Sequence, residues 1–164
     1  MGTRLFSSHS HTLVSASRVY WSTKTDALHR HSTEHWQQIY SSELLAMLPH
    51  GGVLLDIGCG TCHITTYLAA AFEKVYAVDF SESMLTTARQ RIESLKIRNI
   101  HLLFGSAHTF PSEITTVDAI LAHGVVQYFS TDDLIRFLLE CRRVLKSNGI
   151  VCAAIVPDKA RKGL

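Results

Sequence analysis

Short apolar runs alternate with helix-like segments along most of this chain. The runs at 53–56, 75–79, 100–104, 117–121 and 150–156 have the length and composition of buried strands. Apolar residues three or four apart predict helices over 63–72 and 82–95, the second with Met84, Leu85, Ala88, Ile92 and Leu95 on one side. Strands that alternate with helices in this way predict a parallel sheet covered by helices on both faces.

Two further helices flank this alternation. The first is predicted over 33–48, with Ser32 or Thr33 as its cap and Pro49 at its end. Its expected apolar face consists of Trp36, Ile39, Tyr40, Leu44 and Met47. Thr131 is expected to cap the last helix, and Asn148-Gly149 to provide a left-handed stop. The expected apolar stripe of that helix is Leu134, Phe137, Leu138, Cys141 and Leu145.

The composition is typical of one globular domain. Apolar residues make up 46% of the 164 residues and charged residues 18%. We expect a flexible leader over 1–18 and a single domain over 19–164, divided into a helical cap at 19–49 and an α/β core at 50–156. A net charge of +2 does not favour nucleic acid or an anionic membrane as partner, and no apolar run is long enough to span a bilayer. The cysteine spacing suits a reducing cytoplasm.

The segment Asp56-Ile57-Gly58-Cys59-Gly60 carries the main functional signal. It joins a predicted strand to a predicted helix, and its glycines allow a tight turn close to a ligand. A dinucleotide site would have a third glycine where this chain has His63, which argues against such a cofactor. Asp79 ends the next strand 21 residues after Gly58, close to the spacing at which an acid grips a ribose diol. Helix capping is the alternative role for both acids.

Five segments in order carry a family resemblance. They are VLLDIGCGTCHIT at 53–65, VYAVDFSESML at 75–85, GSAHTFP at 105–111, VDAILAHGVVQYF at 117–129 and RVLKSNGIV at 143–151. Together they resemble the motifs of class I S-adenosylmethionine-dependent methyltransferases of the small-molecule type. The resemblance implies a doubly wound, mainly parallel, Rossmann-like sheet with S-adenosylmethionine as cofactor and S-adenosylhomocysteine as product.

The resemblance also implies roles for individual residues. The expected cofactor-binding set is Asp56, Gly58, Cys59 and Gly60 at the methionine moiety, Asp79 at the ribose, Phe80 and Met84 beside the adenine, Ser106 and Ala107 at its edge, and His123 beside the sulfonium. Two positions depart from the family pattern. Cys62 stands where the family pattern has a glycine. Ser106 stands where it has an aspartate, so adenine recognition lacks charge assistance and weaker cofactor affinity is expected.

The implied reaction is methyl transfer to an oxygen or nitrogen atom of a small molecule. Alignment of the nucleophile with the S–CH3 bond supplies much of the rate, and a base can assist. His123 is the candidate base, with a neutral pocket-lining role as the alternative. Tyr128 is a second candidate that can instead pack against the next helix. Tyr20 and Trp21 are expected to close over the cofactor and line the substrate pocket. His108 is expected to face solvent.

Several alternatives stay open beside this interpretation. The chain could bind S-adenosylmethionine without turnover, as an inactive or truncated domain in an assembly. Cys59 and Cys62 form a C-x-x-C pair, but the charge of Asp56 would raise a neighbouring thiol pKa and disfavours redox chemistry. His29, His31 and His35 are expected to form a solvated face rather than a metal site. The residues that follow the fourth strand lack the signature of amino-directed DNA methyltransferases.

The fifth strand is expected to be an open edge. The family's sheet normally continues with an antiparallel hairpin beside that strand, and the sequence as given lacks the length for it. An unpaired strand edge can pair with another chain, so we expect self-association.

Overall fold

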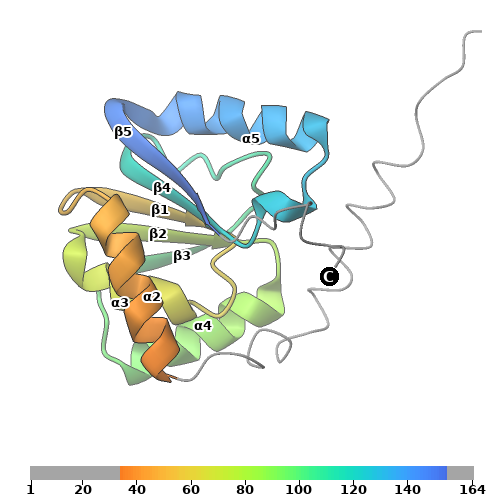
Figure 1. Ribbon diagram of the computed structural model, residues 1–164. Coiled ribbons are helices and arrows are strands. Elements are labelled where there is room, and N and C mark those ends of the chain that lie inside the picture. The colour runs from red at the N-terminus through yellow and green to blue at the C-terminus, as the bar shows by residue number, and fades with distance from the viewer. Residues whose placement is uncertain (1–33, 155–164) are drawn as a thin grey trace, which may run out of the picture.

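The fold was examined in a computed structural model that describes the backbone of residues 34–154 and the side chains of residues 41–154 (Figure 1). The expected leader and the pocket residues Tyr20 and Trp21 lie outside the described residues, as do the side chains of the histidine cluster. None of the helices within the described range is long and apolar enough to cross a membrane.

A five-stranded parallel sheet forms the centre of the molecule, in the order β3-β2-β1-β4-β5. The strands are β1 (Val53–Ile57), β2 (Lys74–Asp79), β3 (Ile100–Phe104), β4 (Val117–His123) and β5 (Leu145–Ala154). The chain runs from β1 outward to β3, then crosses back to β4 on the other side of β1. This order confirms the predicted doubly wound sheet. Within residues 34–154 no antiparallel strand extends the sheet beyond β5.

Helices cover both faces of the sheet (Figure 1). The helices are α2 (Glu34–Met47), α3 (His63–Leu68), α4 (Glu82–Ser94) and α5 (Thr131–Val144), with 3-10 turns η2 (Ala69–Ala71) and η3 (Val126–Tyr128). Residues of α2, α3 and α4 pack against one face, where Leu44, Leu68 and Ala88 are fully buried. On the opposite face, α5 buries Phe137 and Cys141. The strands therefore contact apolar side chains on both faces, which explains their continuous apolar runs.

Two predicted apolar faces end differently from expectation. In α2, Leu44 is buried as predicted, but Met47 is 54% exposed and the neighbouring Leu48 is buried in its place. In α4, four of the five predicted residues are buried, whereas Leu95 is 54% exposed because it lies beyond the last helical turn. Both errors fall at a helix end. There the chain leaves the helical path, so the helical period no longer determines which side chains face the sheet.

The last helix differs from its prediction at both ends. Its cap is Ser130 rather than Thr131, with a reciprocal capping box between Ser130 and Asp133. Leu134 and Leu138 of the predicted stripe are exposed, while Val144 is buried. Gly149 does not adopt a positive φ, so the predicted left-handed stop is wrong.

Gly149 serves close packing instead of a helix stop. The chain passes directly from α5 into β5 at Leu145, five residues earlier than the strand start predicted at residue 150. A Cβ at Gly149 would lie 2.6 Å from the Leu145 side chain and 2.9 Å from the Asp118 carbonyl oxygen. Val117 of β4 pairs with Leu145 of β5, but Ala119 pairs with Ile150, so the register shifts between them. The first residues of β5 therefore form an irregular start to that strand.

Candidate functional site

The candidate site lies at the carboxyl edge of the sheet, where β1 and β4 are neighbours and the chain direction switches. In an open α/β sheet ligands bind beyond the carboxyl ends of the strands at such a switch point. The turns after β1, β2, β3 and β4 therefore meet at one edge, and these turns contain the residues singled out in the sequence.

The turn after β1 is fixed to β2 by backbone hydrogen bonds. The N–H groups of Gly58 and Cys59 donate to the Val78 carbonyl at 2.8 and 3.1 Å. Gly58 has a φ of 72°, and a Cβ there would lie 2.3 Å from Val125 Cγ2. Glycine is therefore required for the left-handed turn and for the close approach of the segment that follows β4.

Asp79 connects the end of β2 to both the glycine turn and α4. Its Oδ2 accepts a hydrogen bond from the Gly60 N–H at 2.9 Å, and its Oδ1 accepts one from the Ser81 N–H at 2.8 Å. Burial raises the pKa of Asp79 above its ordinary value, against the lowering effect of these backbone bonds. Each carboxylate oxygen has a further lone pair, so Asp79 can hold the turn and still accept ribose hydroxyl hydrogens.

Asp56 is a buried carboxyl group at the end of β1. It is 3% exposed, and its Oδ2 accepts a 2.6 Å hydrogen bond from Thr65 Oγ1 of α3. Burial raises the pKa of Asp56 to about 7, the nearby Asp79 carboxylate adds to this, and the Thr65 hydroxyl opposes it. A cation bound beside Asp56 would favour its ionised form, so this group suits a positively charged ligand.

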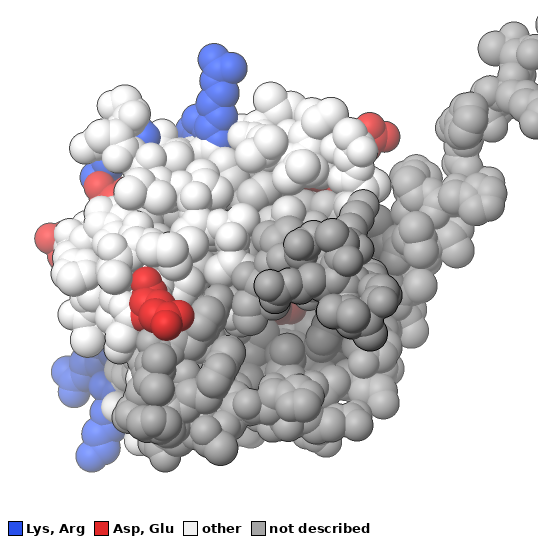
Figure 2. Space-filling model, viewed as in Figure 1, with Lys and Arg blue, Asp and Glu red and all other residues white. Residues whose placement is uncertain are grey.

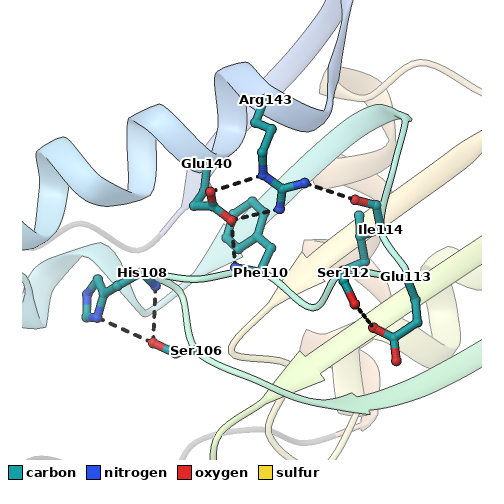
Figure 3. A network of polar contacts seen from close by, with 8 residues as sticks. All are labelled: Ser106, His108, Phe110, Ser112, Glu113, Ile114, Glu140 and Arg143. Atoms are coloured by element: carbon teal, nitrogen blue, oxygen red, sulfur yellow. Dashed lines mark hydrogen bonds and ion pairs between the residues drawn. The ribbon is translucent and has the colours of Figure 1, made fainter.

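The loop after β3 is organised by Ser106. Ser106 Oγ accepts a hydrogen bond from the His108 N–H at 3.1 Å and lies 3.4 Å from His108 Nδ1 (Figure 3). The His108 ring lies with its centre 5.0 Å from that of Phe129, and its Nε2 is 3.6 Å from Asp133 Oδ1. His108 is therefore not solvent-facing as predicted, since its side chain is only 22% exposed. Burial lowers its pKa, although Asp133 opposes this.

The same loop is anchored to α5 by a charged pair. Glu140 Oε2 accepts a 2.7 Å hydrogen bond from the Phe110 N–H and a 2.8 Å hydrogen bond from Arg143 Nη2 (Figure 3). Arg143 Nη1 also donates to the Ile114 carbonyl at 3.4 Å. The loop between β3 and β4 is thus held to α5 at two points, Phe110 and Ile114, without any helix or strand of its own.

His123 and Tyr128 follow the fourth strand but differ in exposure. His123 is the last residue of β4 and is partly buried, and burial lowers its pKa below the ordinary value. Its imidazole is therefore neutral near pH 7, the form that a general base requires. Tyr128 lies in η3 and is 48% exposed.

Cys59 and Cys62 lie three residues apart in the sequence, and the Cys62 N–H donates to the Cys59 carbonyl at 2.9 Å. Both thiols are free, as are those of the other two cysteines. A hydrogen bond with Cys62 and burial raise the pKa of Cys59 well above its usual range, and Asp56 adds to this as expected from the sequence. A thiol that stays protonated is a poor redox nucleophile.

Comparison with known proteins identifies the family. A family model described as a methyltransferase domain matches residues 54–149, more than half of the chain. The chain belongs to the class I S-adenosylmethionine-dependent methyltransferases. The matched range begins at β1 and ends in β5, so it contains all four turns at the carboxyl edge.

Two curated methyltransferases illustrate the range of relatives. Phosphoethanolamine N-methyltransferase 1 of Caenorhabditis elegans is 31% identical over 123 residues, which are 74% of this chain and 26% of that protein. Demethylmenaquinone methyltransferase of Bacillus mycoides is 35% identical over 106 residues, 62% of this chain and 44% of that protein. The chain therefore spans less than half the length of these two methyltransferases.

Solved structures support the Rossmann-like methyltransferase fold. Phosphoethanolamine N-methyltransferase 1 of Haemonchus contortus, in complex with phosphoethanolamine and S-adenosylhomocysteine, aligns with a TM-score of 0.75 at 23% identity, over 88% of this chain and 33% of that one. A protein of Pyrococcus horikoshii aligns with a TM-score of 0.65 at 29% identity, over 75% of this chain and 58% of that one. S-adenosylmethionine is the cofactor of this methyltransferase family.

The residues expected to bind the cofactor differ in their contacts and in their burial. Asp56 and Asp79 are close enough for the charge of Asp79 to raise the pKa of Asp56, and Asp79 also accepts a hydrogen bond from the Gly60 N–H. Met84 lies on α4 and is 2% exposed. Phe80 precedes the helix and is partly buried. Ala107 packs against the cluster beneath α5. The roles of these residues toward a cofactor stay predictions.

Two contributors to the site were missed in the sequence. Thr65 and Arg91 hold the ends of the glycine turn, Thr65 through Asp56 and Arg91 through the Thr61 carbonyl. Thr65 was detectable, because a hydroxyl nine residues after a strand-end acid lies in the first turns of the following helix. Arg91 was not, because it comes from a different helix, 30 residues away along the chain. Within the part of the chain whose side chains are described, no group of histidine, cysteine or acidic residues could hold a metal ion.

Proposed function

We propose that this chain binds S-adenosylmethionine at the carboxyl edge of the sheet and transfers its methyl group to an oxygen or nitrogen atom of a small molecule. The observation that carries the proposal is the placement of the buried acids Asp56 and Asp79 close together at the carboxyl edge of the sheet. Asp56 lies near the end of β1 and Asp79 ends β2, and both retain acceptor capacity beyond their protein hydrogen bonds. Such a pair suits a ligand with a cationic amino acid end and a ribose diol.

The proposed cofactor contacts follow the sheet edge from β1 to β4. The methionine end would lie at Asp56 and the turn Gly58-Cys59-Gly60, the ribose at Asp79, and the sulfonium near His123. The adenine would lie between Phe80 and Met84, with Ser106 and Ala107 at its edge. Because Ser106 Oγ already accepts from the His108 N–H, only its remaining lone pair would be open to the adenine amino group. This supports the expectation of modest cofactor affinity.

His123 is the proposed base for an acceptor that loses a proton on methylation. Burial keeps its imidazole neutral at physiological pH, and it ends the strand that neighbours β1 at the switch point. In the reaction the acceptor's lone pair would attack the methyl carbon, the S–CH3 bond would break to give the neutral thioether, and His123 would accept the acceptor's proton. Tyr128 is exposed and is proposed as part of the acceptor pocket, together with Tyr20 and Trp21.

Calorimetric titration with S-adenosylhomocysteine tests the binding part of the proposal. Asp79→Ala should weaken binding about 100-fold, because it removes the ribose acceptor and releases the Gly60 N–H that fixes the turn. Asp118→Ala is the matched control. Asp118 also accepts two hydrogen bonds, from the Val53 N–H and Lys146 Nζ, but lies at the start of β4 on the opposite edge of the sheet. Equal affinity of the two variants, or no binding by the unsubstituted chain, would refute the proposal.

Turnover distinguishes an enzyme from a chain that only binds the cofactor. Phosphoethanolamine and demethylmenaquinone, named for two relatives, belong in the substrate panel beside simple amines and phenols. We expect His123→Ala to lower the methylation rate about 100-fold with little change in cofactor affinity. Binding without turnover on any acceptor would instead favour the rival function, an inactive domain within an assembly.

The partners proposed for this chain are small molecules and a second copy of itself. Lys and Arg side chains stand apart at the margins of the face shown in Figure 2 and form no continuous stripe there. A cytoplasmic location is proposed from the free thiols. The outer edge of β5 and the exposed apolar residues Ile150 and Val151 support the proposed self-association.

A further inference from the structure

Arg91 of α4 contacts the glycine turn at two points on either side of Cys62. Its Nε donates to the Thr61 carbonyl at 3.1 Å, and its Nη2 lies 2.7 Å from His63 Nε2. Because a guanidinium can only donate, His63 must accept at Nε2 and therefore carries no proton on that nitrogen. One planar group thus fixes the backbone before Cys62 and the side chain after it.

The residue between these two contacts has an unusual backbone conformation. Cys62 has a φ of 57° and a ψ of 29°, in the left-handed region that disfavours side chains with a Cβ. It is also the N-cap of α3 and makes no side-chain capping hydrogen bond. A left-handed residue other than glycine costs about 1 kcal/mol and persists only where neighbouring contacts hold it. The two hydrogen bonds of Arg91 are such contacts.

The contact also lies next to the atoms that position the cofactor acids. The Gly60 N–H donates to Asp79, and the carbonyl of the next residue, Thr61, accepts from Arg91. Asp79 precedes α4 and Arg91 belongs to α4, so the β2–α4 unit holds two nearby peptide groups of the turn. Loss of Arg91 would remove the contacts from α4 that hold this part of the turn, leaving the backbone hydrogen bonds of Cys62 with Cys59 and Thr66 to resist the strain.

We propose that Arg91 is a positioning residue for cofactor binding, which holds the turn at residues 58–62 in its binding geometry without touching the cofactor. The inference rests on the proposed cofactor site and adds a residue that lies in none of its expected contacts. A polar side chain on a solvent-facing turn of α4 would need no such pair of partners. Arg91 instead uses two of its nitrogens on residues that bracket the one left-handed, non-glycine position in the turn.

The test is the dissociation constant of S-adenosylhomocysteine in a set of variants of the full chain. Arg91→Met should raise it about tenfold, since two hydrogen bonds from a charged group are lost and the turn relaxes. Arg91→Lys retains one donor and should raise it about threefold. Arg89→Met is the matched control, because Arg89 lies on the same helix, is exposed and should leave affinity unchanged. Circular dichroism and thermal melting verify that each variant is folded.

A double-mutant cycle with His63→Leu separates positioning from a general loss of stability. Both substitutions break the same contact, so the pair should weaken binding less than twofold beyond Arg91→Met alone. His63→Gln retains an acceptor and should rescue much of the affinity. Additive effects of Arg91 and His63, or affinity of Arg91→Met within about twofold of the unsubstituted chain, would overturn the inference. Failure of Asp79→Ala to affect binding would instead refute the proposed site itself, so the two failures are distinguishable.

Discussion

The two halves of the sheet are stabilised in different ways. On the half formed by β1, β2 and α4, buried acids, backbone donors and Arg91 connect each turn to its neighbour, and α4 buries its apolar residues Met84, Leu85, Ala88 and Ile92. On the half formed by β4, β5 and α5, the helix buries one narrow stripe and exposes another. The exposed apolar residues there are Leu134, Ile135, Leu138, Leu139, Ile150 and Val151.

This contrast coincides with the proposed division between cofactor binding and acceptor binding. The half formed by β1, β2 and α4, the proposed cofactor half, holds its polar groups in fixed positions. The half formed by β4, β5 and α5 has exposed apolar surface that a second copy of the chain could cover.

The largest expected effect comes from the buried stripe of α5. Phe137 is 2% exposed, and its ring contacts those of Phe110 and Phe129 at centre distances of 6.1 and 5.6 Å. Phe137→Ala should lower the free energy of unfolding by about 3–5 kcal/mol, because it leaves a cavity beneath the helix. Urea denaturation measures this. A loss below about 1 kcal/mol would mean that α5 is loosely attached, and the contrast between the halves would then be sharper still.

A pH-dependent effect is expected on the cofactor half. Burial raises the pKa of Asp56 to about 7, so the folded chain binds more protons than the unfolded chain between the unfolded value of 3.8 and about 7. The free energy of unfolding should therefore fall as pH rises through this window, by about 1.4 kcal/mol between roughly pH 6 and 8.

Asp56→Asn is the matched variant for that measurement. The amide oxygen can still accept from Thr65 but does not titrate, so stability at pH 8 should rise and its pH dependence should flatten. Asp79 accounts for part of the pH dependence that remains in this variant, because burial raises its pKa as well. Thermal melting of the unsubstituted chain and of Asp56→Asn, without cofactor and across the same pH range, measures both pH dependences. A stability that rises with pH in the unsubstituted chain would contradict the assignment.

A smaller effect is expected at the start of α5. Ser130 Oγ accepts from the Asp133 N–H at 3.2 Å, and the Ser130 N–H donates in return to the Asp133 carboxylate at 3.1 Å. Ser130→Ala should cost about 1 kcal/mol of unfolding free energy, whereas Thr131→Ala should be nearly neutral. Equal effects would restore Thr131 as the cap predicted from the sequence.

The smallest effect on folding is expected on the exposed stripe. Leu139 is 60% exposed, so Leu139→Gln should change the free energy of unfolding by less than about 0.5 kcal/mol. Together with Val151→Lys on β5, it should reduce self-association measured by light scattering over a concentration series. A chain that is monomeric at all concentrations, with or without these substitutions, would contradict the proposed partner role of this half.

The sequence predicts the fold well where its signals are local. Alternating apolar runs predict all five strands, and the acids and glycines after β1 and β2 predict where the site lies. The errors arise where a tertiary contact decides. Leu134 and Leu138 have the period of a buried stripe, yet α5 buries Phe137, Cys141 and Val144 and leaves both leucines exposed. Gly149 resembles a helix stop, but the close approach of Leu145 is the reason that it lacks a side chain.

Parts of the site depend on contacts that no short motif contains. The Arg91 contact with Thr61 and the His108 contact with Asp133 each join different elements, 30 and 25 residues apart. The family resemblance predicts which turns bind the cofactor. It does not indicate how those turns are held, because the supporting residues Arg91 and Asp133 lie on helices outside the motif segments.

The contact between Gly58 and Val125 has a consequence for changing this protein's specificity. Val125 Cγ2 fills the space that a side chain at Gly58 would need, so the turn proposed to bind the cofactor and the segment proposed to face the acceptor share one van der Waals boundary. A bulkier residue at 125 would press on the cofactor turn and weaken cofactor binding before any acceptor is met. Engineering for a new acceptor should therefore begin beyond Val125, at Gln127 and Tyr128, where side chains are exposed and the boundary is left intact.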